Sequence, residues 1–134
     1  MILLDTCALI WSAENAPLSP DASSLIAHSA RSGELYLSPV SAWEVGVAVK
    51  HRRLRLHLPT EVWLARTFGH PSVQIAVLTA QIAIRSCFLP GDFHDDPADR
   101  FIVATALEMG LKLITRDQYI LHYGRQGYAA VMAC

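Results

Sequence analysis

Short runs of apolar residues alternate with longer helical patterns along the chain, and this alternation limits the fold more than any other feature. Strand-like runs lie at residues 1–4, 34–38, 73–78, 111–115 and 128–133. Strands separated by helices pair in parallel and are covered by helices on both faces. Continuous apolar strands are typical of such sheets. We therefore predict an α/β fold, a three-layer α/β/α arrangement with a central parallel sheet of four or five strands, the last one at an edge.

Turn and capping residues mark the helices between these runs. The pattern predicts helices over 8–13, 20–33, 39–53, 59–70, 79–89, 97–110 and 117–124, with a loop over 90–96. Ser19–Pro20 and Ser38–Pro39 each place a capping residue before a proline at the first helical position. Gly33 and Gly110 are good helix terminators.

Length and composition limit the function further. A chain of 134 residues with 52% hydrophobic residues is expected to form one domain, over residues 1–134, with a substantial core. The formal net charge of −1 gives no overall field that attracts a polyanion, so nucleic acid would need a local basic patch. Cys7, Cys87 and Cys134 are far apart and form no CxxC pair, which favours reduced thiols over disulfides or a zinc site.

The first residues do not resemble a signal peptide. They lack a basic start, and Asp5 interrupts the apolar run. No uncharged stretch reaches the roughly 18 residues that cross a membrane. We expect a cytoplasmic protein with no segment to remove and no membrane contact.

Four acidic residues lie where a parallel sheet places its functional site, beyond the carboxyl ends of its strands. Asp5 directly follows the first strand, and Asp117 follows the strand at 111–115. Asp99 lies in the first turn of the helix before that strand, and Glu44 lies early in the helix after the second strand. We therefore expect these four carboxylates to converge at one edge of the sheet.

Each acid also has an ordinary structural interpretation. Asp96 is a natural helix cap before Pro97, and Asp99 then occupies the position that completes a capping box. Asp117 is also in position to cap the helix that follows it, and Glu44 fits an ordinary acid on a helix surface. Asp5 is harder to explain in this way, because a carboxylate at the end of a buried strand is costly unless it is paired or coordinated.

If the four carboxylates converge, a catalytic role is favoured over helix capping. Two carboxylates about 5 Å apart repel by roughly 3 kcal/mol at an effective dielectric constant near 20. Four carboxylates close together therefore need a cation to offset their repulsion. Oxygen ligands suit Mg²⁺ or Mn²⁺. Such an ion activates a water and stabilises charge on a phosphate, which is the chemistry of phosphodiester hydrolysis without a covalent enzyme intermediate.

Four motifs in order resemble the PIN-domain family, specifically the VapC-type ribonuclease toxins of bacterial toxin–antitoxin pairs. They are LLDTCALIW with Asp5, SPVSAWEVGVAVKHRRL with Glu44, HDDPADRFIVATAL with Asp99, and LITRDQYI with Asp117. The chain departs from the family at Ala98, where Phe is usual, and at Cys7, where Ser or Asn is common.

The resemblance implies an endoribonuclease that depends on Mg²⁺ or Mn²⁺, forms a homodimer and is inhibited by a cognate antitoxin. It implies Asp5 and Asp99 as the main metal ligands, with Glu44 and Asp117 completing the site directly or through water. Two threonines are candidates for orienting a ligand or a water, against the alternative that each bonds only to local backbone. They are Thr6 and Thr115.

We make separate predictions for several other side chains near these motifs. The one basic cluster is a candidate for holding the RNA backbone, against the alternative of a solvated helix end; it comprises Lys50, Arg52, Arg53 and Arg55. We expect Arg100 to form a structural ion pair, and Asp92 and Asp95 to be solvated. His94 adjoins the site and is a candidate for contacting substrate, against the alternative of an ordinary loop histidine. Three tryptophans are expected in the core, against the alternative that some line the groove for an antitoxin helix; they are Trp11, Trp43 and Trp63.

Two other functions stay open. An aspartate-nucleophile phosphatase also places an Asp at the end of its first strand, but it needs a second acid two residues later, where this chain has Cys7. A non-catalytic domain that binds RNA or a partner protein is the other alternative. The presence of all four acids argues against it.

Overall fold

Five short strands form one parallel sheet in the computed structural model, which describes all 134 residues. The strands are β1 (Ile2–Leu4), β2 (Leu35–Leu37), β3 (Val73–Ile75), β4 (Lys112–Thr115) and β5 (Val131–Ala133). Their order across the sheet is β3-β2-β1-β4-β5, and every neighbouring pair is parallel. The predicted parallel sheet is confirmed, and its last strand lies at an edge as expected.

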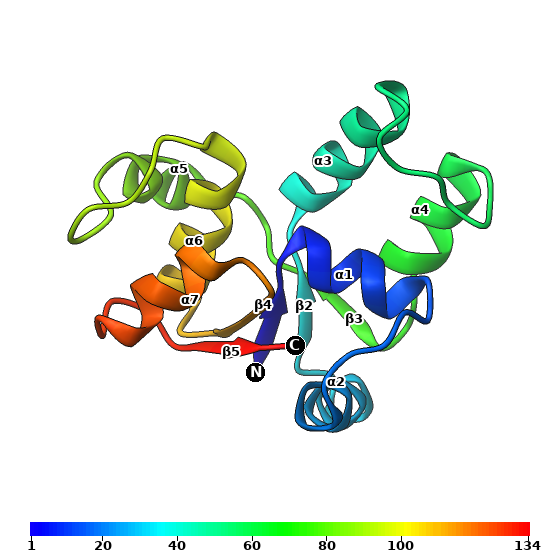
Figure 1. The fold of residues 1–134 in the computed structure, drawn as a ribbon, viewed down its shortest axis with the longest axis horizontal. Helices are drawn as coiled ribbons and strands as arrows, with labels where there is room; N and C mark the ends of the chain where they lie inside the picture. Colours follow the sequence, from blue (N-terminus) through cyan, green and yellow to red (C-terminus); the bar gives the residue numbers. More distant parts are fainter.

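Seven helices cover the two faces of this sheet. They are α1 (Thr6–Ala13), α2 (Pro20–Ser32), α3 (Pro39–Lys50), α4 (Thr60–Phe68), α5 (Ala80–Cys87), α6 (Pro97–Met109) and α7 (Gln118–Arg125). Figure 1 shows α5, α6 and α7 on one side of the sheet and α1 to α4 on the other. This is the predicted three-layer α/β/α arrangement.

Alternate strand residues explain why the strands are apolar without interruption. Leu3 and Leu113 belong to the core packed by α5, α6 and α7. Their neighbours Ile2, Leu4 and Ile114 belong to a second core on the opposite face. Because both faces are covered, successive side chains of β1 and β4 are buried on opposite sides.

The helix ends use the residues that the sequence indicates. The Ser19 and Ser38 hydroxyls accept hydrogen bonds from the backbone N–H groups of Ala22 and Val40, respectively. Gly33 and Gly110 end α2 and α6 with φ angles of 71° and 65°, the left-handed conformation that glycine adopts readily.

Several elements are shorter than predicted, namely α3, α4, α5, β3 and β5. Helix α3 ends at Lys50 instead of residue 53, because Arg52 adopts a φ of 56° and the Arg53 N–H turns back to the Ala48 carbonyl. A non-glycine residue seldom takes this conformation, so the sequence gives no stop signal there. Strand β3 ends at Ile75; the Ala76 N–H still donates to the Leu37 carbonyl, but Val77 and Leu78 beyond it are 65% and 40% exposed.

The expectation for the tryptophans is only partly correct. Trp63 is buried in the core, but Trp43 is 61% exposed. Trp11 is partly exposed and lies beneath the Arg116 guanidinium, whose central carbon is 3.6 Å from the ring centroid. Helix α3 is apolar on more than one side, and the sequence alone does not show which side the rest of the chain covers.

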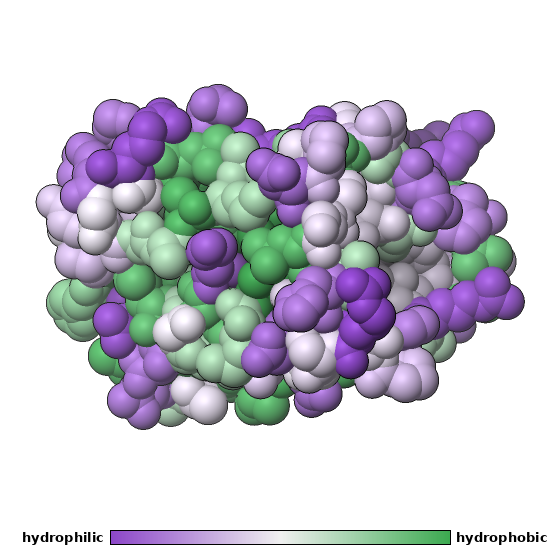
Figure 2. All heavy atoms as spheres, turned by 90° about the horizontal axis from the view of Figure 1, so that it is seen from below, coloured by the Kyte–Doolittle hydropathy of each residue, from purple (hydrophilic) through white to green (hydrophobic).

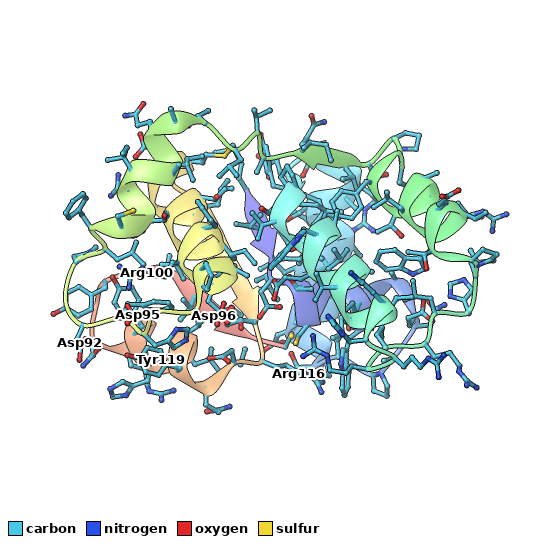
Figure 3. All side chains as sticks on the ribbon, turned by 90° about the horizontal axis from the view of Figure 1, so that it is seen from above. Asp92, Asp95, Asp96, Arg100, Arg116 and Tyr119 are labelled. Carbon is cyan, nitrogen blue, oxygen red and sulfur yellow. The ribbon has the colours of Figure 1, made fainter.

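The two edges of the sheet present different surfaces. Figure 2 looks onto the amino-terminal edge, where apolar side chains gather over the left half and middle of the face, with hydrophilic residues mostly around them. Figure 3 looks onto the carboxyl edge. Of the four predicted acids, Asp5 and Asp117 follow the ends of β1 and β4, Asp99 lies in the first turn of α6, and Glu44 lies in the second turn of α3. No helix has the length and apolar character needed to span a bilayer.

Candidate active site

Asp5 is a buried carboxylate at the centre of the carboxyl edge. Its side chain is 5% exposed and follows β1, the middle strand of the sheet. One carboxylate oxygen accepts the Ala8 N–H at 2.6 Å, which caps α1. The other accepts a hydrogen bond from the Thr115 hydroxyl at the end of β4. Asp5 is thus fixed by donors from two elements that are far apart in sequence.

Thr115 joins Asp5 to Asp117. While its hydroxyl donates to Asp5, the same oxygen accepts the Asp117 N–H at 2.9 Å. The Asp117 side chain caps α7 by accepting the Ile120 N–H, also at 2.9 Å. The capping interpretation of Asp117 is therefore correct, and Thr115 does more than bond to local backbone, because it also holds a buried acid.

Glu44 is held in the same way from α1. Its carboxylate, half-buried on α3, accepts a hydrogen bond from the Thr6 hydroxyl. The Thr6 oxygen also lies 2.9 Å from the hydroxyl oxygen of the buried Ser41. Glu44 is therefore not a free helix-surface acid, and Thr6 does not serve only its local backbone.

Asp99 lies in the first turn of α6 but does not complete a capping box. Asp96 caps the helix as predicted, accepting the Asp99 N–H at 3.0 Å. In a capping box the Asp99 carboxylate would in turn accept the Asp96 N–H. That N–H donates instead to Nδ1 of His94 at 3.2 Å, and Oδ2 of Asp99 lies 3.3 Å from Nε2 of the same ring. The Asp99 side chain thus has no capping role.

The four acids influence one another electrostatically. The pKa of Asp5 is raised from 3.8 to about 6, mainly by burial and also by the charges of Asp117 and Glu44, against the lowering effect of the Thr115 and Ala8 hydrogen bonds. Burial also raises the pKa of Asp99, from 3.8 to about 7, assisted by the charges of other acids, namely Asp96, Asp117, Glu44 and Asp5. The pKa of Glu44 is raised mainly by burial.

The same four acids also affect the pKa of the Cys7 thiol. Cys7 is exposed at the surface, but partial desolvation of its thiol and the charges of four carboxylates together raise its pKa from 9.0 to about 11; the carboxylates are those of Asp5, Glu44, Asp117 and Asp99. A thiol with this pKa stays protonated at neutral pH, so Cys7 has no thiolate character. The position where a DxD phosphatase needs its second acid is therefore occupied by an uncharged side chain.

No basic side chain neutralises this charge. None of the four acids has a lysine or arginine within 4.0 Å, and His94 is the only ionisable partner. Arg116 is adjacent in sequence to Asp117, but its guanidinium packs over Trp11 and donates to the Pro17 carbonyl at 2.8 Å. As the side chains stand, no three His, Cys, Asp or Glu residues are close enough together to hold one metal ion.

The chemistry of these donors nevertheless fits a divalent cation. All four side chains are carboxylates, the ligands that Mg²⁺ and Mn²⁺ prefer. Burial and the charges of neighbouring acids make the charged forms of Asp5, Glu44 and Asp99 less favourable in the absence of a cation. A bound ion would relieve both effects.

The loop before α6 differs from expectation at Arg100. Its guanidinium donates mainly to backbone carbonyls, those of Ser86, Phe93, His94 and Cys87. The only carboxylate nearby is that of Asp95, 4.0 Å away on a fully exposed side chain. The predicted structural ion pair is therefore a minor contact. Figure 3 shows Asp92 and Asp95 along the outer loop, where both are exposed as predicted.

The basic cluster stands at the far end of the helix that carries Glu44. Lys50 lies six residues after Glu44, about 9 Å along the helix axis, and Figure 1 shows α3 rising away from the carboxyl edge toward this end. All four cations are exposed and none has an acidic partner within 4.0 Å: Lys50, Arg52, Arg53 and Arg55.

Sequence reasoning missed the structural roles of two residues beside the acids. His94 contacts Asp99, and Ser41 supports Thr6. Ser41 lies three residues before Glu44, and this spacing places the two on one face of a helix, but a lone serine carries no distinctive signal. His94 precedes the DDPAD segment and gave the better clue.

Comparison with known proteins agrees with the fold and with the order of these motifs. The sequence model of the PIN domain matches residues 2–126. This chain belongs to the PIN-domain family.

Its relatives include a ribonuclease. The chain is 37% identical over 118 residues to ribonuclease VapC22 of Mycobacterium tuberculosis (strain ATCC 25618 / H37Rv). This alignment covers 87% of each protein. Two solved structures share the fold at lower identity. One is VapBC2 from Rickettsia felis bound to a promoter DNA fragment, with a TM-score of 0.71, 15% identity and coverage of 99% of this chain and 98% of that one. The other is a toxin–antitoxin complex from Klebsiella pneumoniae, with a TM-score of 0.58, 22% identity and coverage of 98% and 96%.

Proposed function

We propose that this chain, as one domain over residues 1–134, is a metal-dependent endoribonuclease and the toxin of a toxin–antitoxin pair. The observation that carries the proposal is the set of four carboxylates at the carboxyl edge of the sheet, which lack any lysine or arginine partner. The similarity to a protein named as a ribonuclease supports the same activity.

In this proposal Asp5 and Asp99 are the main ligands of Mg²⁺ or Mn²⁺, and Glu44 and Asp117 complete the site directly or through water. The ion, when bound, supplies an activated water and stabilises the charge that develops on the scissile phosphate. The protein contributes orientation. Thr115 and the Ala8 N–H fix Asp5, while Thr6 fixes Glu44.

The basic cluster at the end of α3 is proposed to hold the RNA backbone beside the acids. Lysine and arginine bind phosphates without reading the bases. Because the net charge of the chain is −1, attraction of RNA depends on such a local patch. The cluster therefore supplies affinity, and the acids supply the chemistry.

The test is cleavage of structured RNA by purified protein free of antitoxin, with Mg²⁺, with Mn²⁺ and with EDTA. We expect cutting that needs the metal and is lost in Asp5→Asn. Asp92→Asn is the matched control, since it removes an equally charged but exposed loop acid. Equal cutting by wild type and Asp5→Asn would show contamination and contradict the proposal. RNA binding without metal and without cleavage would support a non-catalytic domain instead.

The antitoxin part of the proposal has a cellular test. A solved relative with this fold is described as a toxin–antitoxin complex. We expect expression of this chain in bacteria to arrest growth, and co-expression of its cognate antitoxin to restore growth. The Asp5→Asn variant should be harmless alone but should still bind that protein. Growth arrest by Asp5→Asn equal to that by wild type would contradict a ribonuclease toxin.

A second copy of this chain is proposed to cover the apolar surface around Trp43. Trp43 and Leu78 are 61% and 40% exposed, and together with Phe101 they line an apolar pocket of about 330 Å³ between α3 and α6. Exposed apolar patches of this kind mark interfaces. Sedimentation velocity should show a dimer for the wild type and a monomer for Trp43→Glu. A monomeric wild type at micromolar concentration would exclude the dimer.

A further inference from the structure

His94 is held in one orientation beside Asp99. Its Nδ1 accepts the Asp96 N–H at 3.2 Å. A neutral imidazole has one acceptor and one donor nitrogen, so the hydrogen must lie on Nε2. That nitrogen is 3.3 Å from Oδ2 of Asp99, a polar contact that is not aligned as a hydrogen bond in this structure. The backbone of the helix start therefore selects the tautomer that can donate to the acid.

The imidazole ring is also held by its neighbours. The ring centroids of Phe93 and Tyr119 lie 4.5 Å and 4.4 Å from that of His94. The carbonyl of His94 itself accepts a hydrogen bond from Arg100 at 3.0 Å. Both the ring and the backbone of His94 are thus fixed by contacts outside the acidic cluster.

Asp99 has no other side-chain support. Asp5 is held by Thr115, Glu44 by Thr6, and Asp117 by the Ile120 N–H. The carboxylate of Asp99 has no hydroxyl or backbone donor, and His94 supplies its one polar contact. His94 is therefore the side chain that contacts Asp99, as Thr115 contacts Asp5 and Thr6 contacts Glu44.

We propose that His94 is a positioning residue, which orients the Asp99 carboxylate for a metal ion through the contact of its Nε2 with Oδ2 and leaves Oδ1 free. This inference rests on the proposed metal site. Groups that hydrogen-bond a ligating carboxylate fix its direction, and their loss typically weakens metal binding by about 10-fold to 100-fold.

The experiment is a calorimetric titration of the full chain with Mn²⁺ in the absence of RNA. His94→Phe keeps a ring between Phe93 and Tyr119 but removes the donor. His94→Gln removes the ring but can present an amide N–H near the position of Nε2. We expect Mn²⁺ affinity to fall about 10-fold in His94→Phe and to recover at least half of that loss, on a logarithmic scale, in His94→Gln.

Failure of this inference is distinct from failure of the metal site. If wild type and Asp99→Asn bind Mn²⁺ equally, the proposed site itself is wrong. If Asp99→Asn weakens binding while His94→Phe binds like wild type, only the role of His94 is wrong. Equal weakening in His94→Phe and His94→Gln would also overturn it, because the donor would then not matter.

A measurement without substitution covers the case in which His94→Phe does not fold. Nitrogen chemical shifts of the imidazole distinguish the two neutral tautomers in the wild-type protein. We expect His94 to carry its hydrogen on Nε2. A hydrogen on Nδ1 would remove the donor that faces Asp99 and would overturn the proposal.

Discussion

The Thr115 hydroxyl joins two acids, because it donates to the carboxylate of Asp5 while it accepts the backbone N–H of Asp117 at 2.9 Å. Thr115 is fully buried, so water cannot replace either bond. Thr115→Val keeps the shape and removes both bonds. We expect kcat/KM for RNA cleavage to fall roughly 10-fold, with a higher Mg²⁺ requirement, because Asp5 loses a donor that orients it.

Thr115→Ser is the matched control for this prediction. It retains the hydroxyl and removes only a methyl group, so its activity should stay within about threefold of wild type, since the hydrogen-bonded geometry is kept. A fully active Thr115→Val would show that the orientation of Asp5 does not limit the reaction.

The raised pKa values make the stability of the metal-free protein depend on pH. Asp5 and Asp99 have folded-state pKa values of about 6 and about 7, above the ordinary 3.8. Such groups favour the folded state fully below the unfolded pKa, and this stabilisation is lost as the pH rises through the folded pKa. In EDTA we expect the free energy of unfolding to fall by about 2 kcal/mol from pH 5 to pH 8, after allowance for partial exposure.

Urea unfolding at several pH values measures this effect. Asp99→Asn removes one of the two groups, so its stability should decline less over the same range and should exceed that of wild type at pH 8. Saturating Mn²⁺ should flatten the wild-type profile, because the ion favours the charged carboxylates. A wild-type profile that is already flat in EDTA would contradict the repulsion described for these acids.

The basic cluster should act on binding and not on chemistry. Replacing Arg52 and Arg53 together with glutamine should raise KM and leave kcat unchanged, because both side chains lie beyond the acidic site. The dependence of log KM on log salt concentration should become shallower by about 1.4, since each phosphate contact on single-stranded RNA contributes about 0.7. Arg31→Gln, an exposed cation on α2, is the control and should change neither quantity.

Arg100 should matter for stability more than any ion pair at this loop. Its guanidinium donates to four carbonyls of residues 86–94, which join α5 and the following loop to α6. Arg100→Leu should destabilise the fold by about 3 kcal/mol in urea unfolding, because these carbonyls lose charged donors. Arg100→Lys should recover less than half of this loss, since an ammonium lacks the planar fork. Asp95→Asn should leave the unfolding midpoint unchanged.

The sequence predicted the fold closely because its elements are locally consistent. Apolar strands, serine–proline helix starts and glycine stops all indicate the same boundaries. The gathering of Asp5, Glu44, Asp99 and Asp117 near one edge also followed, since strand ends in a parallel sheet share an edge. These inferences depend on periodicity and topology, which a single sequence contains.

The remaining details depend on contacts between distant residues. The bond from Thr115 to Asp5 links positions 110 residues apart, and no local pattern encodes it. The same holds for Arg100, whose carbonyl partners are backbone groups that any residue type supplies. Arg52 takes a left-handed conformation without glycine, and the exposure of Trp43 depends on which face of α3 the other helices leave open.

The place of β1 in the middle of the sheet has a consequence for how the protein is made. Asp5 leaves the ribosome before β4, which pairs with β1, carries Thr115 and emerges more than 100 residues later. A nascent chain that ends before this strand lacks both the neighbour that holds Asp5 and the acid at position 117. The four acids can therefore come together only after β4 and Asp117 have been translated, and a translation product that is interrupted before them lacks that arrangement.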